Sequence, residues 1–164
     1  MPPLISVVTI CYNAKNDLEK TILSVLSQTY QDIEYIIIDG GSTDGTVDII
    51  HKYSERLFYW ISEPDKGIYD AMNKGMDRAT GSWINFMNAG DTFCDNEVIK
   101  NIFGYNDLSD YSVIYGDCYV SKLNQLQYLK ASSMKKVHVQ MPLCHQSSFI
   151  RKTRVRSSID LKIA

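Results

Sequence analysis

The run Ile36 to Ile38 leads directly into Asp39 and a pair of glycines. A short run of β-branched residues without polar alternation is typical of a strand that is buried on both faces, as in a parallel sheet. The glycines allow the backbone to turn sharply and to approach a ligand closely. Ser42 or Thr43 can cap a following helix, so the stretch predicts a buried strand, a tight turn and a helix.

The predicted strand places the carboxylate of Asp39 at its carboxyl end, beside backbone N–H groups. In open α/β sheets this edge is where ligands bind. An ordinary strand-to-helix turn with a capping aspartate would contain the same residues. This stretch alone therefore leaves a ligand site and a structural turn as open alternatives.

Apolar patterns along the rest of the chain alternate between strand and helix. We predict further strands at 4–11, 57–62, 82–87, 111–119 and 147–150, helices at 18–26, 44–53, 68–79 and 96–103, and a hairpin at 120–130 that turns at Asn124. Gly75 lies inside the third helix, where glycine costs about 1 kcal/mol relative to alanine, and we attribute it to tight packing of helix on sheet. The alternation predicts a single α/β domain with a mostly parallel central sheet flanked by helices.

A second aspartate, Asp91, follows the strand predicted at 82–87, after a bend at Gly90. Because parallel strands end at the same edge of a sheet, we expect Asp39 and Asp91 to open onto one crevice. One acidic residue plus substrate phosphates commonly holds Mg²⁺ or Mn²⁺, so Asp91 is a candidate metal ligand. Capping of the helix that begins near Asp95 is the alternative explanation.

The composition limits the classes of function. With 164 residues, of which 45% are hydrophobic, the chain is long enough for one domain with a real core. A net charge of −2 gives no indication of nucleic-acid binding. We find no apolar run close to the roughly 20 residues of a membrane span and no signal-peptide pattern at the N-terminus. The cysteines and histidines are scattered without metal-ligand spacing, so we expect a cytoplasmic protein with reduced thiols and no structural zinc.

Short motifs occur along the chain in a specific order, at 6–13, 38–46, 65–75, 88–91, 115–117 and 144–147. Each is weak alone, but their order and spacing together are specific. In these motifs the chain resembles the inverting family 2 nucleotide-sugar glycosyltransferases of GT-A fold, especially bacterial members that build surface polysaccharides. The resemblance implies one Rossmann-like GT-A domain over 1–164, with a donor half at 1–91 and an incomplete acceptor half at 92–164.

The resemblance also implies a role for each matching residue. The end of the first strand would line the base and ribose pocket, and Asp39 would hydrogen-bond the nucleobase, usually a uracil. Asp91 matches the metal-binding carboxylate of the family, which implies Mn²⁺ or Mg²⁺ as cofactor, although Asn88 and Gly90 stand where carboxylates are common. The nucleotide-sugar site implied in this way comprises Thr9, Cys11, Asn13, Asp39, Lys66, Asp70, Asn88, Asp117 and His145. Asp117 and His145 would face the sugar and the acceptor.

The reaction and the partners follow from the same resemblance. A sugar would pass, with inversion, from a nucleotide-sugar donor, usually UDP-linked, to a saccharide or lipid-linked acceptor during synthesis of cell-surface polysaccharide. A lipid-linked acceptor is compatible with peripheral association at the inner face of the cell membrane, and a homodimer is also compatible with the sequence.

The general base of such enzymes is a carboxylate on the acceptor side of the site. Relatives with a tail like 159–164 usually carry that carboxylate just beyond it, whereas this sequence stops at Ala164. We therefore expect a shortened glycosyltransferase whose usual base would lie beyond Ala164. Asp160 is the candidate substitute base.

Other classes of protein remain as alternatives. A non-catalytic nucleotide- or sugar-binding module would keep the Asp39 and Asp91 loops and lack the acceptor-side carboxylate. A dinucleotide-binding oxidoreductase is disfavoured because no Gly-x-Gly-x-x-Gly follows an early strand. A response-regulator-like domain would need an acidic pair at the end of the first strand, where this chain has Tyr12 and Asn13.

Overall fold

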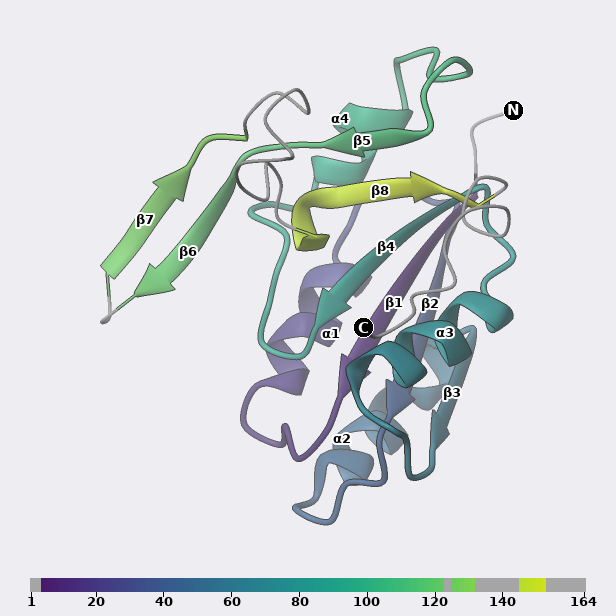
Figure 1. Cartoon of the computed structure of the whole chain (residues 1–164), viewed down its shortest axis with the longest axis vertical. Coiled ribbons are helices and arrows are strands. Elements are labelled where there is room, and N and C mark those ends of the chain that lie inside the picture. Colours follow the sequence, from purple (N-terminus) through teal and green to yellow (C-terminus); the bar gives the residue numbers. More distant parts are fainter. Residues whose placement is uncertain (1–3, 123–124, 132–144, 153–164) are drawn as a thin grey trace.

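The sheet is built around β1, which has a parallel partner on each side. The computed structural model describes residues 4–122, 125–131 and 145–152. In this part of the chain six strands form one sheet in the order β3-β2-β1-β4-β8-β5 (Figure 1). The first four strands of that order are parallel, and β8 runs antiparallel to both of its neighbours. The strands of this sheet are β1 (Ile5–Cys11), β2 (Ile33–Asp39), β3 (Tyr59–Ser62), β4 (Trp83–Asn88), β5 (Val113–Tyr115) and β8 (Ser148–Arg151).

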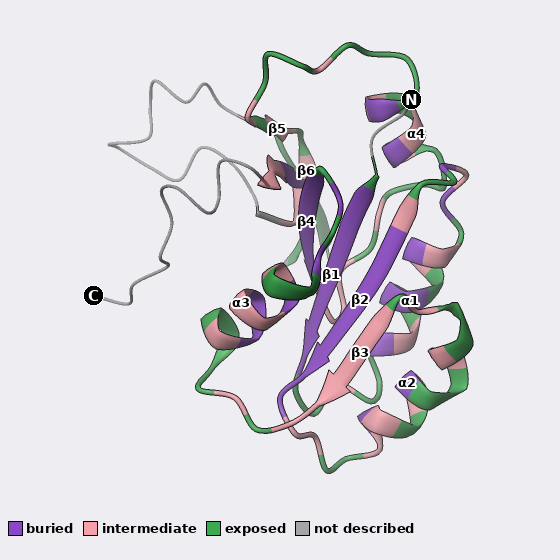
Figure 2. Cartoon of the chain, turned by 90° about the vertical axis from the view of Figure 1, so that its right-hand side faces the viewer, coloured by how far each residue is buried: buried purple, intermediate pink, exposed green. Residues whose placement is uncertain are grey.

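Helices cover both faces of this sheet, as Figure 2 shows with α3 on one side and α1 and α2 on the other. Side chains alternate across a strand, so neighbouring residues enter different cores. Val7 and Ile37 belong to the core under α1 and α2, whereas Val8 and Ile36 belong to the core under α3. The helices are α1 (Leu18–Leu26), α2 (Thr46–Tyr53), α3 (Ile68–Arg78) and α4 (Val98–Phe103), with short 3₁₀ turns η1 (Ser54–Arg56) and η3 (His145–Ser147).

The prediction of a mostly parallel α/β sheet is confirmed, and so is the explanation of Gly75. A Cβ atom at Gly75 would lie 2.3 Å from Cγ1 of Val8 on β1. Real Cβ atoms do not approach so closely, so glycine is required for α3 to lie against the sheet. None of the described helices is long and apolar enough to cross a membrane.

Two local predictions were wrong. The single strand expected at 111–119 is divided into β5 and β6 (Cys118–Lys122), because β6 leaves the main sheet to pair with β7 (Gln125–Leu129) in a separate hairpin (Figure 1). The predicted turn at Asn124 lies outside the described residues. The N-cap of α2 is Gly45, with φ 99°, in place of Ser42 or Thr43. Asp44 accepts the N–H of Thr46 at 2.9 Å and so satisfies the first turn of that helix.

Candidate functional site

An open cleft of about 740 Å³ lies at the carboxyl edge of the parallel strands. The sheet register places Cys11, Asp39 and Ser62 side by side at this edge. The walls come from the ends of β1 and β4 and from the loops that follow β2 and β3. The lining residues are Ile10, Cys11, Tyr12, Ala14, Gly40, Gly41, Pro64, Asp65, Gly67, Ile68, Asn88 and Ala89. β2 and β4 end at the same edge of the sheet, as predicted, but neither Asp39 nor Asp91 is among the residues that line the cleft.

Asp39 is fully buried at the end of β2, where its carboxylate organises the next turn. It accepts the N–H groups of Gly41 at 3.1 Å and Ser42 at 2.9 Å, the hydroxyl of Ser62 at 2.6 Å, and the hydroxyl of Ser42. Burial by itself would raise the pKa of Asp39, but the hydrogen bonds from Ser42 and Ser62 outweigh it and hold the pKa below the ordinary value. Asp39 therefore stays ionised and shapes the Gly40–Gly41 wall of the cleft from behind.

The last residues of β1 lie partly in the cleft lining and partly in the core. Cys11 lines the cleft and places its Sγ 3.5 Å from Oδ1 of Asp39. Burial, with the nearby charge of Asp39, raises the pKa of the Cys11 thiol, which keeps the thiol neutral. Thr9 was expected to line the base and ribose pocket, but it is fully buried, with Oγ1 2.9 Å from the Tyr35 hydroxyl. Because it lies two residues inside the strand end, Thr9 is covered by the core and does not line the cleft.

Asn13 joins the loops that follow β1 and β2. It has a left-handed backbone, φ 48°, which asparagine tolerates better than most residues. Its N–H donates to the Ser42 hydroxyl at 2.8 Å, and its Oδ1 accepts the N–H of Thr43 at 3.0 Å. Asn13 was expected to line the base and ribose pocket, but in the structure it bonds the loop after β2 and is not among the residues that line the cleft.

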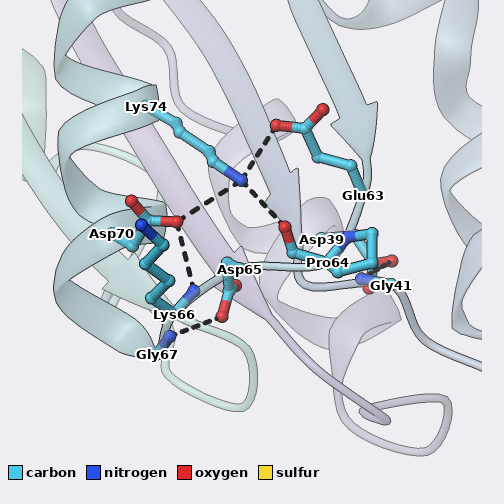
Figure 3. Close-up of polar contacts among 9 residues, drawn as sticks. All are labelled: Asp39, Gly41, Glu63, Pro64, Asp65, Lys66, Gly67, Asp70 and Lys74. Carbon is cyan, nitrogen blue, oxygen red and sulfur yellow. Dashed lines mark hydrogen bonds and ion pairs between the residues drawn. The ribbon is translucent and has the colours of Figure 1, made fainter.

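The loop between β3 and α3 forms another wall and is fastened by Lys74 (Figure 3). The Lys74 amine lies 2.8 Å from Glu63, 3.2 Å from the Pro64 carbonyl and 3.5 Å from Asp70. Asp70 in turn accepts the N–H of Lys66 at 3.2 Å, which is the first cause of the lowered pKa of Asp70, ahead of Lys74. Lys74 was not among the predicted site residues, although its position four residues after Asp70 is the spacing of a helical ion pair.

This loop meets the turn after β2 at close range, which explains the two glycines. A Cβ atom at Gly40 would lie 2.6 Å from Oδ2 of Asp65, and one at Gly41 would lie 3.2 Å from the Pro64 nitrogen. Gly41 also has φ 85°, which favours glycine. A larger residue at Gly40 would displace the Asp65 side chain, and one at Gly41 would press on the backbone at Pro64.

Asp91 ends a turn that two other parts of the chain hold in place. Thr21, fully buried on α1, accepts the N–H of Gly90 at 2.8 Å and donates to the Asp91 carbonyl at 2.8 Å. Oδ2 of Asp91 accepts the side-chain amide of Gln146, in η3, at 3.0 Å. Thr21 was missed by sequence analysis, where its only signal is a hydroxyl on the apolar face of the predicted helix.

The remaining predicted site residues are placed as follows. Asn88 lines the cleft, and the backbone of His145 begins η3, next to Gln146. Asp117 is exposed and accepts the N–H of Ala131 at 2.8 Å and the Tyr128 hydroxyl, so in this structure it closes the base of the β6–β7 hairpin. The acceptor-side role expected of Asp117 stays a prediction.

The expected general base is not tested by the structure. Both Asp160, the candidate substitute, and Ala164, beyond which the usual carboxylate of the family would lie, fall outside the described residues. A base beyond Ala164 and a substitute role of Asp160 therefore both stay predictions.

The donor set at this edge fits a divalent cation that takes most of its ligands from elsewhere. The described residues contain no group of three or more His, Cys, Asp or Glu side chains that could hold a metal ion. Asp91 is partly exposed, and its Oδ2 is engaged by Gln146. One carboxylate with phosphate oxygens and waters is the way in which Mg²⁺ is usually bound in phosphate-transfer sites.

Several α/β folds have an open, mostly parallel sheet with a cleft at the carboxyl ends of its strands, and comparison with solved structures identifies this one as the GT-A fold. S. aureus TarS 1-349 in complex with UDP-GlcNAc superposes with a TM-score of 0.74 at 16% identity, covering 93% of this chain and 46% of that one. The mannosyltransferase PcManGT from Pyrobaculum calidifontis, in complex with GDP-Man and Mn²⁺, gives a TM-score of 0.63 at 22% identity, covering 71% and 36%.

The chain belongs to glycosyl transferase family 2, whose profile matches residues 6–160. It is 32% identical over 157 residues to a PGL/p-HBAD biosynthesis glycosyltransferase of Mycobacterium bovis, covering 92% of this chain and 60% of that protein. It is 38% identical over 103 residues to TuaG of Bacillus subtilis, a putative teichuronic acid biosynthesis glycosyltransferase, covering 61% and 41%. The chain thus spans about 60% of the length of the PGL/p-HBAD biosynthesis glycosyltransferase of M. bovis.

Proposed function

We propose that this protein binds a nucleotide-sugar donor, UDP-linked, and transfers its sugar with inversion to a saccharide or lipid-linked acceptor of the cell surface. The observation that carries the proposal is the cleft of about 740 Å³ at the edge where β2 ends in Asp39 and β4 ends in Asn88, shortly before Asp91. Its volume lies within the range of small-molecule sites. The relatives named for glycolipid and teichuronic acid biosynthesis support the class of product, and the TarS complex supports the UDP-linked donor.

The walls of the cleft suit the two ends of a nucleotide. Tyr12 is 66% exposed although it lines the cleft, so its ring offers a face on which a base can stack. The apolar residues Pro64 and Ile68 lie in the same lining, to which Asn88 at the end of β4 and the following Ala89 also belong. We place the base at Tyr12 and the loop after β2, and the diphosphate toward the turn that carries Asp91.

Asp91 would hold the divalent cation, which supplies Lewis-acid stabilisation of the leaving diphosphate when it is bound. PcManGT, solved with GDP-Man and Mn²⁺, supports this cofactor. Asp39 contributes indirectly, since its ionised carboxylate keeps the Gly40–Gly41 turn folded against Asp65. A general base on the acceptor side, with Asp160 as its candidate, stays a prediction, as do membrane association and a homodimer.

Calorimetric titration of UDP with and without Mn²⁺ tests the donor site. We expect Mn²⁺ to strengthen UDP binding to the wild type, and Asp91→Ala to abolish that gain. Asp110→Ala, an exposed aspartate on the loop before β5, is the matched control and should behave as the wild type. Equal UDP affinity with and without Mn²⁺ in all three proteins would refute the metal assignment.

Hydrolysis of the donor separates an enzyme from a binding module. A competent donor site releases sugar to water, so we expect slow formation of free UDP from the nucleotide sugar that binds best in a thermal-shift panel. Firm binding with no release above the uncatalysed rate would identify a non-catalytic nucleotide-sugar-binding protein.

A further inference from the structure

The carboxylate of Asp91 is held from outside its own turn by Gln146. The two residues are far apart in the sequence, and the amide Nε2 of Gln146 donates to Oδ2 of Asp91 at 3.0 Å. An amide bound to one carboxylate oxygen fixes the rotation of the carboxyl group. It also occupies a lone pair of that oxygen, so Oδ1 is the oxygen better placed to bind a cation.

Gln146 is itself anchored, which makes this contact more than a chance surface meeting. Asn85, a fully buried polar residue on β4, donates from Nδ2 to the Gln146 carbonyl at 2.9 Å and to the Ser148 carbonyl at 2.9 Å. The neighbouring Ser147 accepts the N–H of Gly116 with its carbonyl and donates its hydroxyl to the Gly116 carbonyl. The backbone that follows the Gln146 side chain is therefore tied to β4 and to the residue after β5.

The turn that carries Asp91 is anchored independently through Thr21, which bonds both Gly90 and the Asp91 carbonyl. The main chain of Asp91 and the rotation of its side chain are thus set by different elements, α1 and η3. A single carboxylate that is fixed at both levels is a preorganised ligand, whereas an unheld surface aspartate can rotate to offer both of its oxygens.

We propose that Gln146 is a positioning residue that restricts Asp91 to one-oxygen coordination of the donor-bound cation and so selects small octahedral ions. Mg²⁺ demands near-ideal octahedral geometry at short distances, whereas Ca²⁺ accepts bidentate carboxylates at longer distances. With Oδ2 bound to Gln146, the Asp91 carboxylate offers one oxygen, which suits the octahedral shell of Mg²⁺ and not the bidentate coordination that Ca²⁺ accepts. This inference rests on the proposed function, in which Asp91 would hold the cation together with the donor diphosphate.

The variant Gln146→Leu keeps a similar volume and removes the amide donor. We expect its Mn²⁺ affinity, titrated calorimetrically in the presence of UDP, to fall by about tenfold, as for other residues that orient a metal ligand. The Ca²⁺ affinity should change little, so the ratio of Mn²⁺ to Ca²⁺ affinity should fall by a similar factor. Gln127→Leu, on the exposed strand β7, is the control and should keep both values.

The outcomes distinguish this inference from the proposed function. If the wild type shows no Mn²⁺-dependent UDP binding, both fail. If the wild type binds but Gln146→Leu keeps the wild-type ratio of Mn²⁺ to Ca²⁺ affinity, the positioning role is refuted and the proposed function stands. A higher Mn²⁺ affinity in Gln146→Leu would also refute it, because the amide would then compete with the cation. Circular dichroism of each variant checks that a lowered ratio is measured on folded protein.

Discussion

The amine of Lys74 on α3 lies 2.8 Å from the carboxylate of Glu63, the residue that follows β3, and so closes the β3–α3 loop into a ring. The same amine bonds the Pro64 carbonyl and lies near Asp70. The ammonium group of Lys74 therefore balances the charges of two carboxylates, those of Glu63 and Asp70, beside a cleft that is proposed to take a diphosphate. Without it, both the position of the loop and the local charge would be less favourable for an anionic ligand.

Replacing Lys74 with methionine should weaken UDP binding by about fivefold, because the loop loses the ion pairs that anchor it. Calorimetric titration measures the change. Lys52→Met is the control. Lys52 on α2 pairs with Glu19 on α1 at 2.6 Å, and neither helix contributes a residue to the cleft lining. An equal loss in both variants would show a general effect of charge and would contradict a role of Lys74 in the loop.

Removal of the Asp39 carboxylate should act through the turn that it organises. Asp39→Ala leaves the N–H groups of Gly41 and Ser42 and the Ser62 hydroxyl without their shared acceptor. We expect UDP binding to weaken by about 1–3 kcal/mol, the cost of leaving such groups unsatisfied. Asp48→Ala, exposed on α2, provides the comparison. A change in UDP affinity smaller than the error of titration would count against a pocket at this turn.

A methyl group at position 75 should force α3 away from β1. We expect Gly75→Ala to lower the free energy of unfolding by about 1–3 kcal/mol, because overpacking against Val8 outweighs the gain in helix propensity of about 1 kcal/mol. Urea denaturation measures the change. Asp77→Ala, exposed on the same helix, gains propensity without the clash and should be neutral or slightly stabilising. Unchanged or greater stability of Gly75→Ala would mean that helix and sheet are not in tight contact.

Glu34, which lies at the edge of the sheet opposite the cleft, should make the free energy of unfolding depend on pH. It is 4% exposed and accepts hydrogen bonds from Ser6, Thr80 and Gly81. Burial opposes ionisation, but these bonds prevail and hold the pKa of Glu34 below its ordinary value of 4.5.

Since the folded state has the lower pKa, the stabilisation is complete above pH 4.5 and is lost as the pH falls through the folded pKa. Glu34→Gln should therefore be less stable than the wild type at pH 7, by about 1–3 kcal/mol, and the gap should narrow in acid. Urea denaturation at pH 7 and at successively lower pH values measures it, with Glu55→Gln, exposed in η1, as the control. A gap between wild type and Glu34→Gln that is constant with pH would contradict the assignment.

Much of the structure of residues 1–91 was predictable because its information is local. The isoleucine run before Asp39 and the glycines after it specify a buried strand and a turn with left-handed backbone, and the structure has both. Gly75 was likewise interpretable, since glycine inside a helix has few explanations other than close packing. Residue patterns of this kind depend on the period of strand and helix and need no knowledge of the partners.

Contacts between distant segments could not be predicted in the same way. The sequence by itself determined a parallel α/β sheet with one aspartate at the end of β2 and another in the turn after β4, because backbone geometry and burial impose those patterns on neighbouring residues. Only the tertiary structure decided that Asp39 turns inward to its own loop, that Thr9 is covered, and that Gln146 reaches Asp91. These outcomes depend on hydrogen bonds between strands and loops that are distant in the sequence. Packing of the whole domain brings these segments together, and no local spacing of residues encodes their contacts.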